Sequence, residues 1–404
     1  MARILVLGAG FAGLWAALGA ARKRDEIGAR AADTEILVVD RNAYHNIRVR
    51  NYEVDLGDVA LPLKDLLDPV GVRHRVAEVA AIDPARRQVT IKTSAGTEVL
   101  SYDRLLLTTG SELVRPAISG LAAHGFDVDT YEAAMRLDAH LAALGKQPPS
   151  EARTSVAVVG AGFTGIEVAA EMPAKLAHAG ITGDHRVILI DPNPVVGATF
   201  GTHGRLVINE ALAALGVETR LNVRVSAISS DSITLNSGEI IPTKTVVWCA
   251  GMRASPLAAS LPARRDALGR IKVDHTMRVE GLADVFAAGD VAACLIDGEH
   301  PTVMSCQFAR PMGRFAGHNV VADLFGEKLL QLNIDWYVTV LDLGAWGALY
   351  TTGWDREVHT TGAAAKLTKQ TINQQRIYPP RNGDRAALLA AAAPTIQTAP
   401  PTRK

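Results

Sequence analysis

The sequence predicts an α/β fold in which two Rossmann-like units are followed by a smaller C-terminal region. The main observation is a repeated pattern, ILVLGAGFAGLWAAL at residues 4–18 and VAVVGAGFTGIEVAA at residues 156–170. In each copy an apolar run leads into G-x-G-x-x-G and a helical run, and a second apolar run then ends in an aspartate. The pattern indicates two βαβ units that each bind a dinucleotide.

Each glycine of the repeat has a mechanical role. The first allows a tight turn, the second lets backbone approach a pyrophosphate at the helix N-terminus, and the third lets the helix pack on the strand. These glycines are Gly8, Gly10 and Gly13 in the first copy and Gly160, Gly162 and Gly165 in the second. The runs EILVVD and RVILID end in Asp40 and Asp191, which we expect to hold ribose hydroxyls.

The composition bounds the class of protein. With 404 residues the chain is too long for one hydrophobic core and indicates about two or three domains. The 42 Lys and Arg residues balance 42 Asp and Glu residues, so no basic field favours nucleic acid as a partner. Only three cysteines occur, without C-x-x-C spacing, and the histidines show no metal-ligand spacing. We expect a reducing compartment and no metal site.

We expect the chain to carry no targeting segment and no membrane-spanning helix. The N-terminus passes directly into the first predicted strand, and no uninterrupted run of about 18 apolar residues occurs. We expect a cytoplasmic protein that is at most peripheral on the inner face of the cell membrane.

The expected domains are discontinuous in sequence. Residues 1–112 and 261–330 should form the first dinucleotide-binding domain, and residues 113–260 the second. Residues 331–380 should form a small C-terminal region. Residues 381–404, with an alanine run and prolines, are expected to be a flexible tail.

The intervening elements follow from local pattern. Residues 89–102 are typical of a hairpin, residues 103–111 of a buried strand, and residues 129–145 of a helix. Residues 243–256 and 284–292 each contain another apolar strand that is stopped by glycine.

Glycines and one carboxylate at the ends of these strands are candidate cofactor contacts. Gly110 and Gly251 end strands where the chain crosses between the two domains. Gly289 and Asp290 stop the strand in 284–292, and so present a carboxylate at the edge of the sheet where α/β proteins bind ligands.

Together these features resemble the flavoprotein superfamily with two dinucleotide sites, in which FAD occupies the first unit and NAD(P)H the second. The chain is most similar to the type II NADH dehydrogenases, on the basis of VVWCAGMRASP at 246–256 and ARPMGRFAGHNVVADLFG at 309–326. The resemblance implies that the first three glycines contact the FAD pyrophosphate, Asp40 the adenosine ribose and Asp290 the ribityl chain.

The same resemblance assigns the second unit. Its glycines and Asp191 would bind the nicotinamide dinucleotide, and a carboxylate there favours NADH over NADPH, although Arg186 lies nearby in sequence. Glu167 matches the glutamate placed where nicotinamide approaches flavin. A favourable helix dipole is the alternative explanation for an acidic residue at this position.

The expected electron path has no dithiol relay. Disulfide reductases of this superfamily carry a cysteine pair after the first unit, whereas residues 41–54 contain none. Hydride should pass from NADH to FAD, and from there directly to an acceptor.

The segment 301–309 matches the Ala-Gln position of quinone-reducing relatives. Gln307 stands at the glutamine, Cys306 replaces the alanine, and both are candidate catalytic residues. A helix beginning here would direct its N-terminus at the flavin, with Pro311 as an interior kink. Pairing of Cys306 with Cys294 is an alternative, and Cys249 is expected in the core.

Three segments leave alternatives open. The polar residues after 355 offer few membrane anchors. Arg48 and Arg50 are candidates for binding cofactor phosphates or a charged acceptor, or for forming a solvated face, and His45 is either a hydrogen-bonding residue or a flavin contact. The tryptophan-rich segment 336–354 is a core or dimer-packing hairpin, or a cover over the flavin.

The sequence thus favours an FAD-dependent NADH oxidoreductase that reduces a quinone by two electrons without pumping protons. The alternative is a soluble diaphorase-type enzyme with another small aromatic, nitro or redox-protein acceptor. A third hypothesis is a flavoprotein that senses NADH. Relatives suggest a homodimer formed through the third region.

Overall fold

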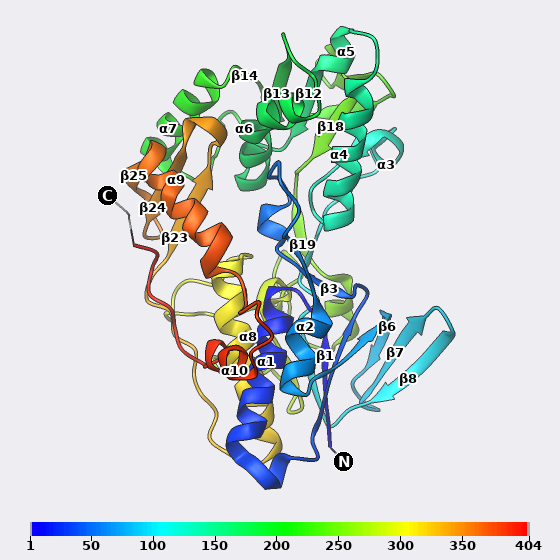
Figure 1. The fold of residues 1–404 in the computed structure, drawn as a ribbon, viewed down its shortest axis with the longest axis vertical. Helices are drawn as coiled ribbons and strands as arrows, with labels where there is room; N and C mark the ends of the chain where they lie inside the picture. Colours follow the sequence, from blue (N-terminus) through cyan, green and yellow to red (C-terminus); the bar gives the residue numbers. More distant parts are fainter. Residues whose placement is uncertain (1, 402–404) are drawn as a thin grey trace.

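Two parallel β-sheets form the centres of two lobes in the computed structural model, which describes residues 2–401 (Figure 1). The first sheet has the strand order β21-β9-β1-β2-β5. Its strands are β1 (Arg3–Leu7), β2 (Glu35–Asp40), β5 (Arg73–Val76), β9 (Arg104–Leu107) and β21 (Val285–Ala287). Since β21 follows the second sheet in the sequence, the first lobe is built from two separate stretches of chain.

The second sheet repeats this architecture, with the strand order β11-β18-β12-β13-β14. Its strands are β11 (Gly125–Phe126), β12 (Ser155–Val159), β13 (Arg186–Asp191), β14 (Val217–Leu221) and β18 (Thr245–Trp248). All five residues of β12 are buried, as expected for a central parallel strand that is covered on both faces.

The predicted strand, turn and helix are present in both lobes, which confirms the α/β fold class. Helix α1 (Phe11–Ile27) follows β1, and α6 (Phe163–His178) follows β12. In each case the helix-leading strand pairs in parallel with the strand that ends in aspartate, β2 or β13. The boundaries proposed for the domains stay a prediction.

Smaller sheets and helices surround the two parallel sheets. The predicted hairpin at 89–102 is β7 and β8, and the helix predicted at 129–145 is α4. The smaller strands are β3 (Tyr44–Asn46), β4 (Ala60–Pro62), β6 (Glu78–Asp83), β7 (Gln88–Thr93), β8 (Gly96–Ser101), β15 (Val225–Ile228), β16 (Ser232–Leu235), β17 (Ile240–Pro242), β20 (Ile271–Lys272) and β22 (Ala292–Ala293). Further helices are α2 (Leu63–Leu67), α3 (Leu121–His124), α4 (Tyr131–Gly145), α5 (Glu151–Thr154) and α7 (Gly201–Ala214).

Helices α1 and α8 (Cys306–Leu324) pack with their backbones in direct contact. A Cβ added at Gly313 would lie 2.3 Å from the Ala12 carbonyl oxygen, and one at Gly317 would lie 2.1 Å from that of Ala16. Because both residue numbers increase in the same direction along the contact, the two helices are parallel. Their N-termini therefore lie on the same side of the lobe.

The chain crosses between the lobes twice, as an antiparallel pair. Strand β10 (Ser111–Leu113) pairs with β19 (Met252–Ala254). The residues before them, Gly110 and Gly251, have φ angles of 67° and 84°, a left-handed conformation that glycine adopts without strain. Gly110 and Gly251, which the sequence predicted at the crossings between the lobes, thus form the turns there.

The tryptophan-rich segment forms the predicted hairpin, β23 (Val338–Asp342) and β24 (Ala348–Thr352), followed by β25 (Glu357–Thr361) and α9 (Gly362–Thr371). Leu341 and Leu349 are fully buried in the core of the second lobe. The hairpin therefore has the core-packing role that was one of its expected alternatives.

The prediction of a flexible tail at 381–404 is wrong for the part that the structure describes, residues 381–401. Helix α10 (Arg385–Ala391) packs against α1, and Leu388 and Ala392 are fully buried. The alanine and leucine run has an apolar face. Burial of this face against the protein stabilises the folded segment relative to one that remains in solvent. Within residues 2–401 no helix has the length and apolar composition of a membrane span.

The contact between α1 and α8 yields a stability prediction. Gly317→Ala adds helix propensity but forces the new Cβ against the α1 backbone, so the free energy of unfolding should fall by about 2–4 kcal/mol. Gly204→Ala in α7 is the control, because its Cβ would meet side chains no nearer than 3.2 Å. Urea unfolding of the two variants measures the difference, and equal stability would contradict the close helix contact.

Candidate functional site

A cavity of about 660 Å³ is lined by both lobes and by the C-terminal region. Its walls come from the first glycine turn, the crossing strands, the start of α6, the start of α8 and strand β23. Of the predicted site residues, those that line it are Gly8, Gly10, Asp40, Gly110, Glu167, Gly289, Asp290, Cys306 and Gln307. Those outside its lining are Gly13, Gly160, Gly162, Gly165, Asp191 and Gly251. The cavity thus brings together candidates that the sequence places far apart.

The first glycine turn has the geometry needed to hold a pyrophosphate. Gly8 has a φ of 98°, and a Cβ on Gly13 would lie 1.8 Å from the Gly8 carbonyl oxygen, so α1 sits directly against the turn. A Cβ on Gly10 would meet nothing within 4 Å, which leaves open space at the N-terminus of α1. A phosphate can approach backbone amides and a helix dipole at such a place.

The second glycine turn reproduces the same three features. Gly160 has a φ of 109°, a Cβ on Gly165 would lie 1.7 Å from the Gly160 carbonyl oxygen, and the space around Gly162 is open. The three glycines of this turn do not line the cavity described above. Phe163 and Thr164, the first two residues of α6, do line it. The second unit therefore offers its own phosphate cradle and meets the first at the start of α6.

Asp40 and Asp191 tie these turns to the neighbouring strands. Asp40 Oδ2 accepts a hydrogen bond of 2.6 Å from the Ala9 amide, and Asp191 Oδ2 accepts one of 2.6 Å from the Ala161 amide. The two carboxylates thus have one role in common, which is to orient the glycine turns. The predicted contacts with ribose hydroxyls stay a prediction.

Arg186 does not neutralise Asp191. The two residues lie at opposite ends of β13, and Arg186 pairs with Glu218 and with Glu151 at 2.8 Å each. The negative charge of Asp191 is therefore not offset by this arginine.

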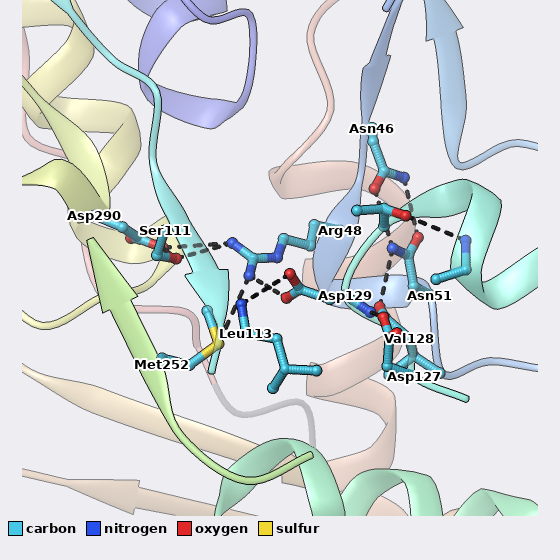
Figure 2. A network of polar contacts seen from close by, with 12 residues as sticks. Asn46, Arg48, Asn51, Ser111, Leu113, Asp127, Val128, Asp129, Met252 and Asp290 are labelled. Carbon is cyan, nitrogen blue, oxygen red and sulfur yellow. Dashed lines mark hydrogen bonds and ion pairs between the residues drawn. The ribbon is translucent and has the colours of Figure 1, made fainter. Parts of the chain in front are cut away.

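Asp290 belongs to a polar network centred on Arg48 (Figure 2). Ser111 Oγ donates a hydrogen bond of 2.7 Å to Asp290 Oδ2 and accepts one of 3.0 Å from Arg48 Nη1. The other terminal nitrogen of Arg48 pairs with Asp129. Burial raises the pKa of Asp290, and the nearby Arg48 opposes this shift. Arg48 thus links the first lobe to the crossing strand and to the carboxylate predicted for the ribityl chain.

Arg50 has different partners from Arg48. It pairs with Glu53 at 2.7 Å and with Asp58 at 2.6 Å, and its guanidinium lies beside Tyr378. Only 5% of Arg50 is exposed, so the solvated-face alternative does not apply to it. The structure assigns this arginine to internal ion pairs.

Unsatisfied polar atoms gather where α8 begins. Thr109 Oγ1, Ser305 Oγ and Gln307 Nε2 are buried without a hydrogen-bond partner in the described residues, and all three residues line the cavity. A buried polar group without a partner is costly, so a polar ligand at this position would stabilise the site. A ring system with carbonyl oxygens and ring nitrogens, such as the flavin of FAD, has suitable groups.

Helix α8 begins at Cys306 and contains Pro311. The proline has no amide hydrogen, so it cannot bond to the Gln307 carbonyl four residues earlier, which loosens the first turn. Burial raises the pKa of the Cys306 thiol, so the uncharged thiol is favoured.

The other two cysteines are also free. Cys294 is buried with its sulfur near the Asp274 carbonyl, outside the cavity lining, which argues against the alternative pairing with Cys306. Cys249 was expected in the core, but it is only partly buried and lines the cavity. The reason is that β18 ends at Trp248, so the next side chain leaves the sheet.

Glu167 lies in a buried charge cluster on the cavity wall. Its Oε1 accepts hydrogen bonds of 2.7 Å from Lys369 Nζ and 3.0 Å from the Asp342 amide. Tyr52 donates a hydrogen bond of 3.1 Å to Asp342. Burial raises the pKa of Glu167 from 4.5 to about 7, with Lys369 acting in the opposite direction. This carboxyl group can therefore gain or lose a proton near neutral pH.

His45 supports the first turn from behind the cavity. It is fully buried, its Nδ1 lies 2.8 Å from the Ala9 carbonyl oxygen, and it is not part of the cavity lining. Burial lowers its pKa to about 4, so the neutral ring is favoured. The hydrogen-bonding alternative for His45 agrees with this geometry.

Sequence reasoning missed several residues of the site. Lys369 is 202 positions from Glu167, and Asp342 belongs to the C-terminal hairpin. No motif or spacing marks these residues. Only the folding of the third region onto α6 brings Lys369 to the cavity wall and Asp342 to Glu167. Within residues 2–401 no group of three or more His, Cys, Asp or Glu side chains is arranged to hold a metal ion.

Comparison with known proteins identifies the family to which this chain belongs. Residues 2–313 match the family described as pyridine nucleotide-disulphide oxidoreductase. The chain is 56% identical over 403 residues to a NADH dehydrogenase-like protein of Mycobacterium tuberculosis, covering 99% of this chain and 100% of the relative. It is 28% identical over 379 residues to the demethylphylloquinone reductase of Synechocystis. This match covers 92% of this chain and 91% of the relative. The solved structure of NDH2 from Plasmodium falciparum with NADH shares the fold, with a TM-score of 0.77 at 13% identity, covering 96% and 97%.

The raised pKa of Glu167 predicts a pH dependence of stability. The folded protein binds a proton that the unfolded chain releases between pH 4.5 and about 7, so the stabilising contribution is complete below pH 4.5 and lost as the pH rises through about 7. Glu167→Gln should remove this loss, which amounts to about 3 kcal/mol at most.

Urea unfolding of the wild type and of Glu167→Gln over this pH range measures the effect. Glu210→Gln on the exposed face of α7 is the matched control. Parallel curves for the wild type and Glu167→Gln would show that the buried carboxyl group does not titrate as expected.

Proposed function

Because the chain belongs to the pyridine nucleotide-disulphide oxidoreductase family, we propose that it is an FAD-dependent NADH oxidoreductase that reduces a quinone. The observation that carries the proposal is one cavity shared by the first glycine turn, Glu167 at the start of the second unit, and the N-terminus of α8. The balanced reaction converts NADH, one proton and a quinone into NAD⁺ and a quinol. The family assignment agrees with the cofactors expected from the sequence, FAD and NADH.

The two glycine turns bind and orient the dinucleotides. The open space at Gly10 and Gly162 admits a pyrophosphate to each helix N-terminus, while Asp40 and Asp191 hold the turns in shape. The first unit would hold FAD, which would supply the hydride acceptor for NADH and a two-electron donor for the final acceptor. The protein supplies alignment of the two rings, which is a large part of such catalysis.

Glu167 and Lys369 position the nicotinamide side of the cavity and hold a proton there. They form a buried pair at 2.7 Å, with 5% and 6% of the residues exposed. A carboxyl group with a pKa near 7 is suited to proton transfer at neutral pH. Gln307, with its unsatisfied Nε2, is proposed to donate to a carbonyl oxygen of the ring system bound at α8.

Cys306 does not need to act as a redox relay in this reaction. Its thiol is kept neutral by burial, and residues 41–54 contain no cysteine. Direct transfer from the reduced cofactor to the acceptor is therefore the simplest route. The names of the relatives, a NADH dehydrogenase-like protein and a demethylphylloquinone reductase, support NADH as donor and a quinone as acceptor.

A soluble acceptor is the second candidate, and one observation favours it. Residues after α10 fold back over the protein, with Ile396, Gln397 and Pro400 lining the cavity instead of extending as a membrane anchor. A cytoplasmic enzyme with at most peripheral contact with the inner face of the membrane fits this arrangement. A homodimer through the third region is part of the same proposal.

The first experiment is steady-state oxidation of NADH by purified protein with added FAD. A soluble quinone, ferricyanide and dissolved oxygen are compared as acceptors, with and without liposomes. We expect rapid turnover with quinone, and liposome enhancement would establish peripheral membrane action. Rapid flavin reduction by NADH with poor quinone turnover would contradict the quinone acceptor and favour the soluble one.

A reciprocal pair of variants tests the assignment of the two units. Asp191→Ala should raise the KM for NADH about tenfold while the bound flavin stays near the wild-type level, because only the second turn loses its carboxylate. Asp40→Ala should instead lower the flavin content of the purified protein, measured by visible absorbance. Loss of FAD in Asp191→Ala, or of NADH affinity alone in Asp40→Ala, would reverse the assignment.

A further inference from the structure

Three arginines line the cavity on the side of the C-terminal region. Arg310 and Arg314 lie one turn apart in α8, and Arg376 ends the turn of π-helix (Ile372–Arg376) that follows α9. Within residues 2–401 none of the three is in an ion pair with a carboxylate. Their hydrogen bonds, where present, go to neutral groups: Arg310 to the Gln397 side chain at 3.3 Å and Arg376 to the Thr398 carbonyl at 2.6 Å.

The two arginines of α8 are deeply buried. Only 7% of Arg310 and 4% of Arg314 is exposed, and the Nε atoms of both are buried without a hydrogen-bond partner in the described chain. Their guanidinium groups stack over the Trp15 ring, at 4.9 and 4.3 Å from its centroid. The cation–π contacts fix the two groups in place but do not neutralise their charge.

These groups remain cationic at neutral pH despite burial. Burial lowers the pKa of Arg310 to about 9, with the like charge of Arg314 adding to the shift, and burial lowers that of Arg314 to about 10. Charges buried without a counterion are strongly unfavourable. An arrangement that retains them side by side indicates that a counterion completes it.

The protein does not supply that counterion from the cavity wall. Every carboxylate that lines the cavity has another partner: Asp40 (Ala9 amide), Glu112 (Arg253), Asp129 (Arg48), Glu132 (Tyr44), Glu167 (Lys369) and Asp290 (Ser111). Within residues 2–401 the cavity wall therefore offers no free carboxylate to these arginines, and a bound ligand can supply the counterion.

The segment 393–401 covers this side of the cavity. Side chains elsewhere in the described chain give it few hydrogen bonds: besides those from Arg310 and Arg376, Tyr350 donates one of 2.7 Å to the Pro400 carbonyl and Thr368 donates one of 3.5 Å to the Pro401 carbonyl. Ile396, Gln397 and Pro400 line the cavity. A ligand between α8 and this segment would be shielded from water, which strengthens its attraction to the guanidinium groups.

We propose that Arg310, Arg314 and Arg376 form an anion-binding site beneath segment 393–401, and that the electron acceptor carries an acidic group, a carboxylate, sulfonate or phosphate, that binds there. The inference rests on the proposed function and specifies its acceptor. The pyrophosphate of FAD is the other source of anionic charge. It has its own cradle at the open space beside Gly10, whereas Arg376 and the covering segment belong to the C-terminal region.

The test compares two soluble naphthoquinones that differ in charge, a neutral 2-methyl compound and a 2-sulfonate. In Arg314→Met the KM for the sulfonate should rise about tenfold more than that for the neutral quinone, because a charge-assisted contact is lost. Arg376→Gln should also raise the KM for the sulfonate more than that for the neutral quinone. Arg314→Lys should recover part of the affinity for the sulfonate that Arg314→Met loses. Arg136→Gln, an exposed arginine of α4, is the matched control.

A second readout does not depend on turnover. The naphthoquinone sulfonate should raise the Tm of the wild-type holoprotein and not that of Arg314→Met, since a ligand stabilises only the state that binds it. Arg314→Met without the sulfonate should be at least as stable as the wild type, because a buried unpaired charge is replaced by an apolar side chain.

Two results would overturn the proposal. One is an equal change in KM for both quinones. The other is loss of FAD from Arg314→Met together with weaker binding of FAD, but not of riboflavin, to the apoprotein, which would assign the arginines to the cofactor pyrophosphate. If neither quinone is reduced, the proposed function fails by itself, and a sulfonate-dependent Tm that needs Arg314 still supports the anion site.

Discussion

The close contact between α1 and α8 is the constraint on which the rest of the structure depends. Gly313 and Gly317 let the backbones of two parallel helices touch, so both N-termini point toward one cavity. In the function proposed above, the two aligned helix dipoles would act on one elongated ligand, the first at its pyrophosphate and the second near its ring system. A side chain at either glycine would force the two helices apart.

The charged side chains differ between the two sides of the cavity. On one side they form ion pairs with each other, and on the other side they do not. On the first, Glu167 with Lys369 and Asp290 with Arg48 form pairs in which each charge has a partner. On the second, Arg310 and Arg314 are held by the face of Trp15 and have no carboxylate partner in the part of the chain that the structure describes. Paired charges keep their position whether or not a ligand is bound, while unpaired ones depend on what enters.

Much of the fold could be predicted because its signals are local. The turns at Gly8 and Gly160, the hairpin β7–β8 and helix α4 each depend on a few neighbouring residues. The tail was predicted wrongly because its composition is typical of flexible chain, and its burial depends on the apolar surface of α1. The exposure of Cys249 to the cavity was missed for a similar reason, since it depends on β18 ending one residue earlier, at Trp248.

The sequence by itself determined two nucleotide-binding units, their glycines and aspartates, and the absence of a cysteine pair from residues 41–54. These features depend on backbone conformation within single turns, or on residue type alone. Only the tertiary structure decided that Lys369 pairs with Glu167, that Arg48 joins Asp290, and that the C-terminal segment covers the cavity. Such contacts join residues far apart in the chain, and they form only where the packing of distant elements brings the partners together, which no local pattern encodes.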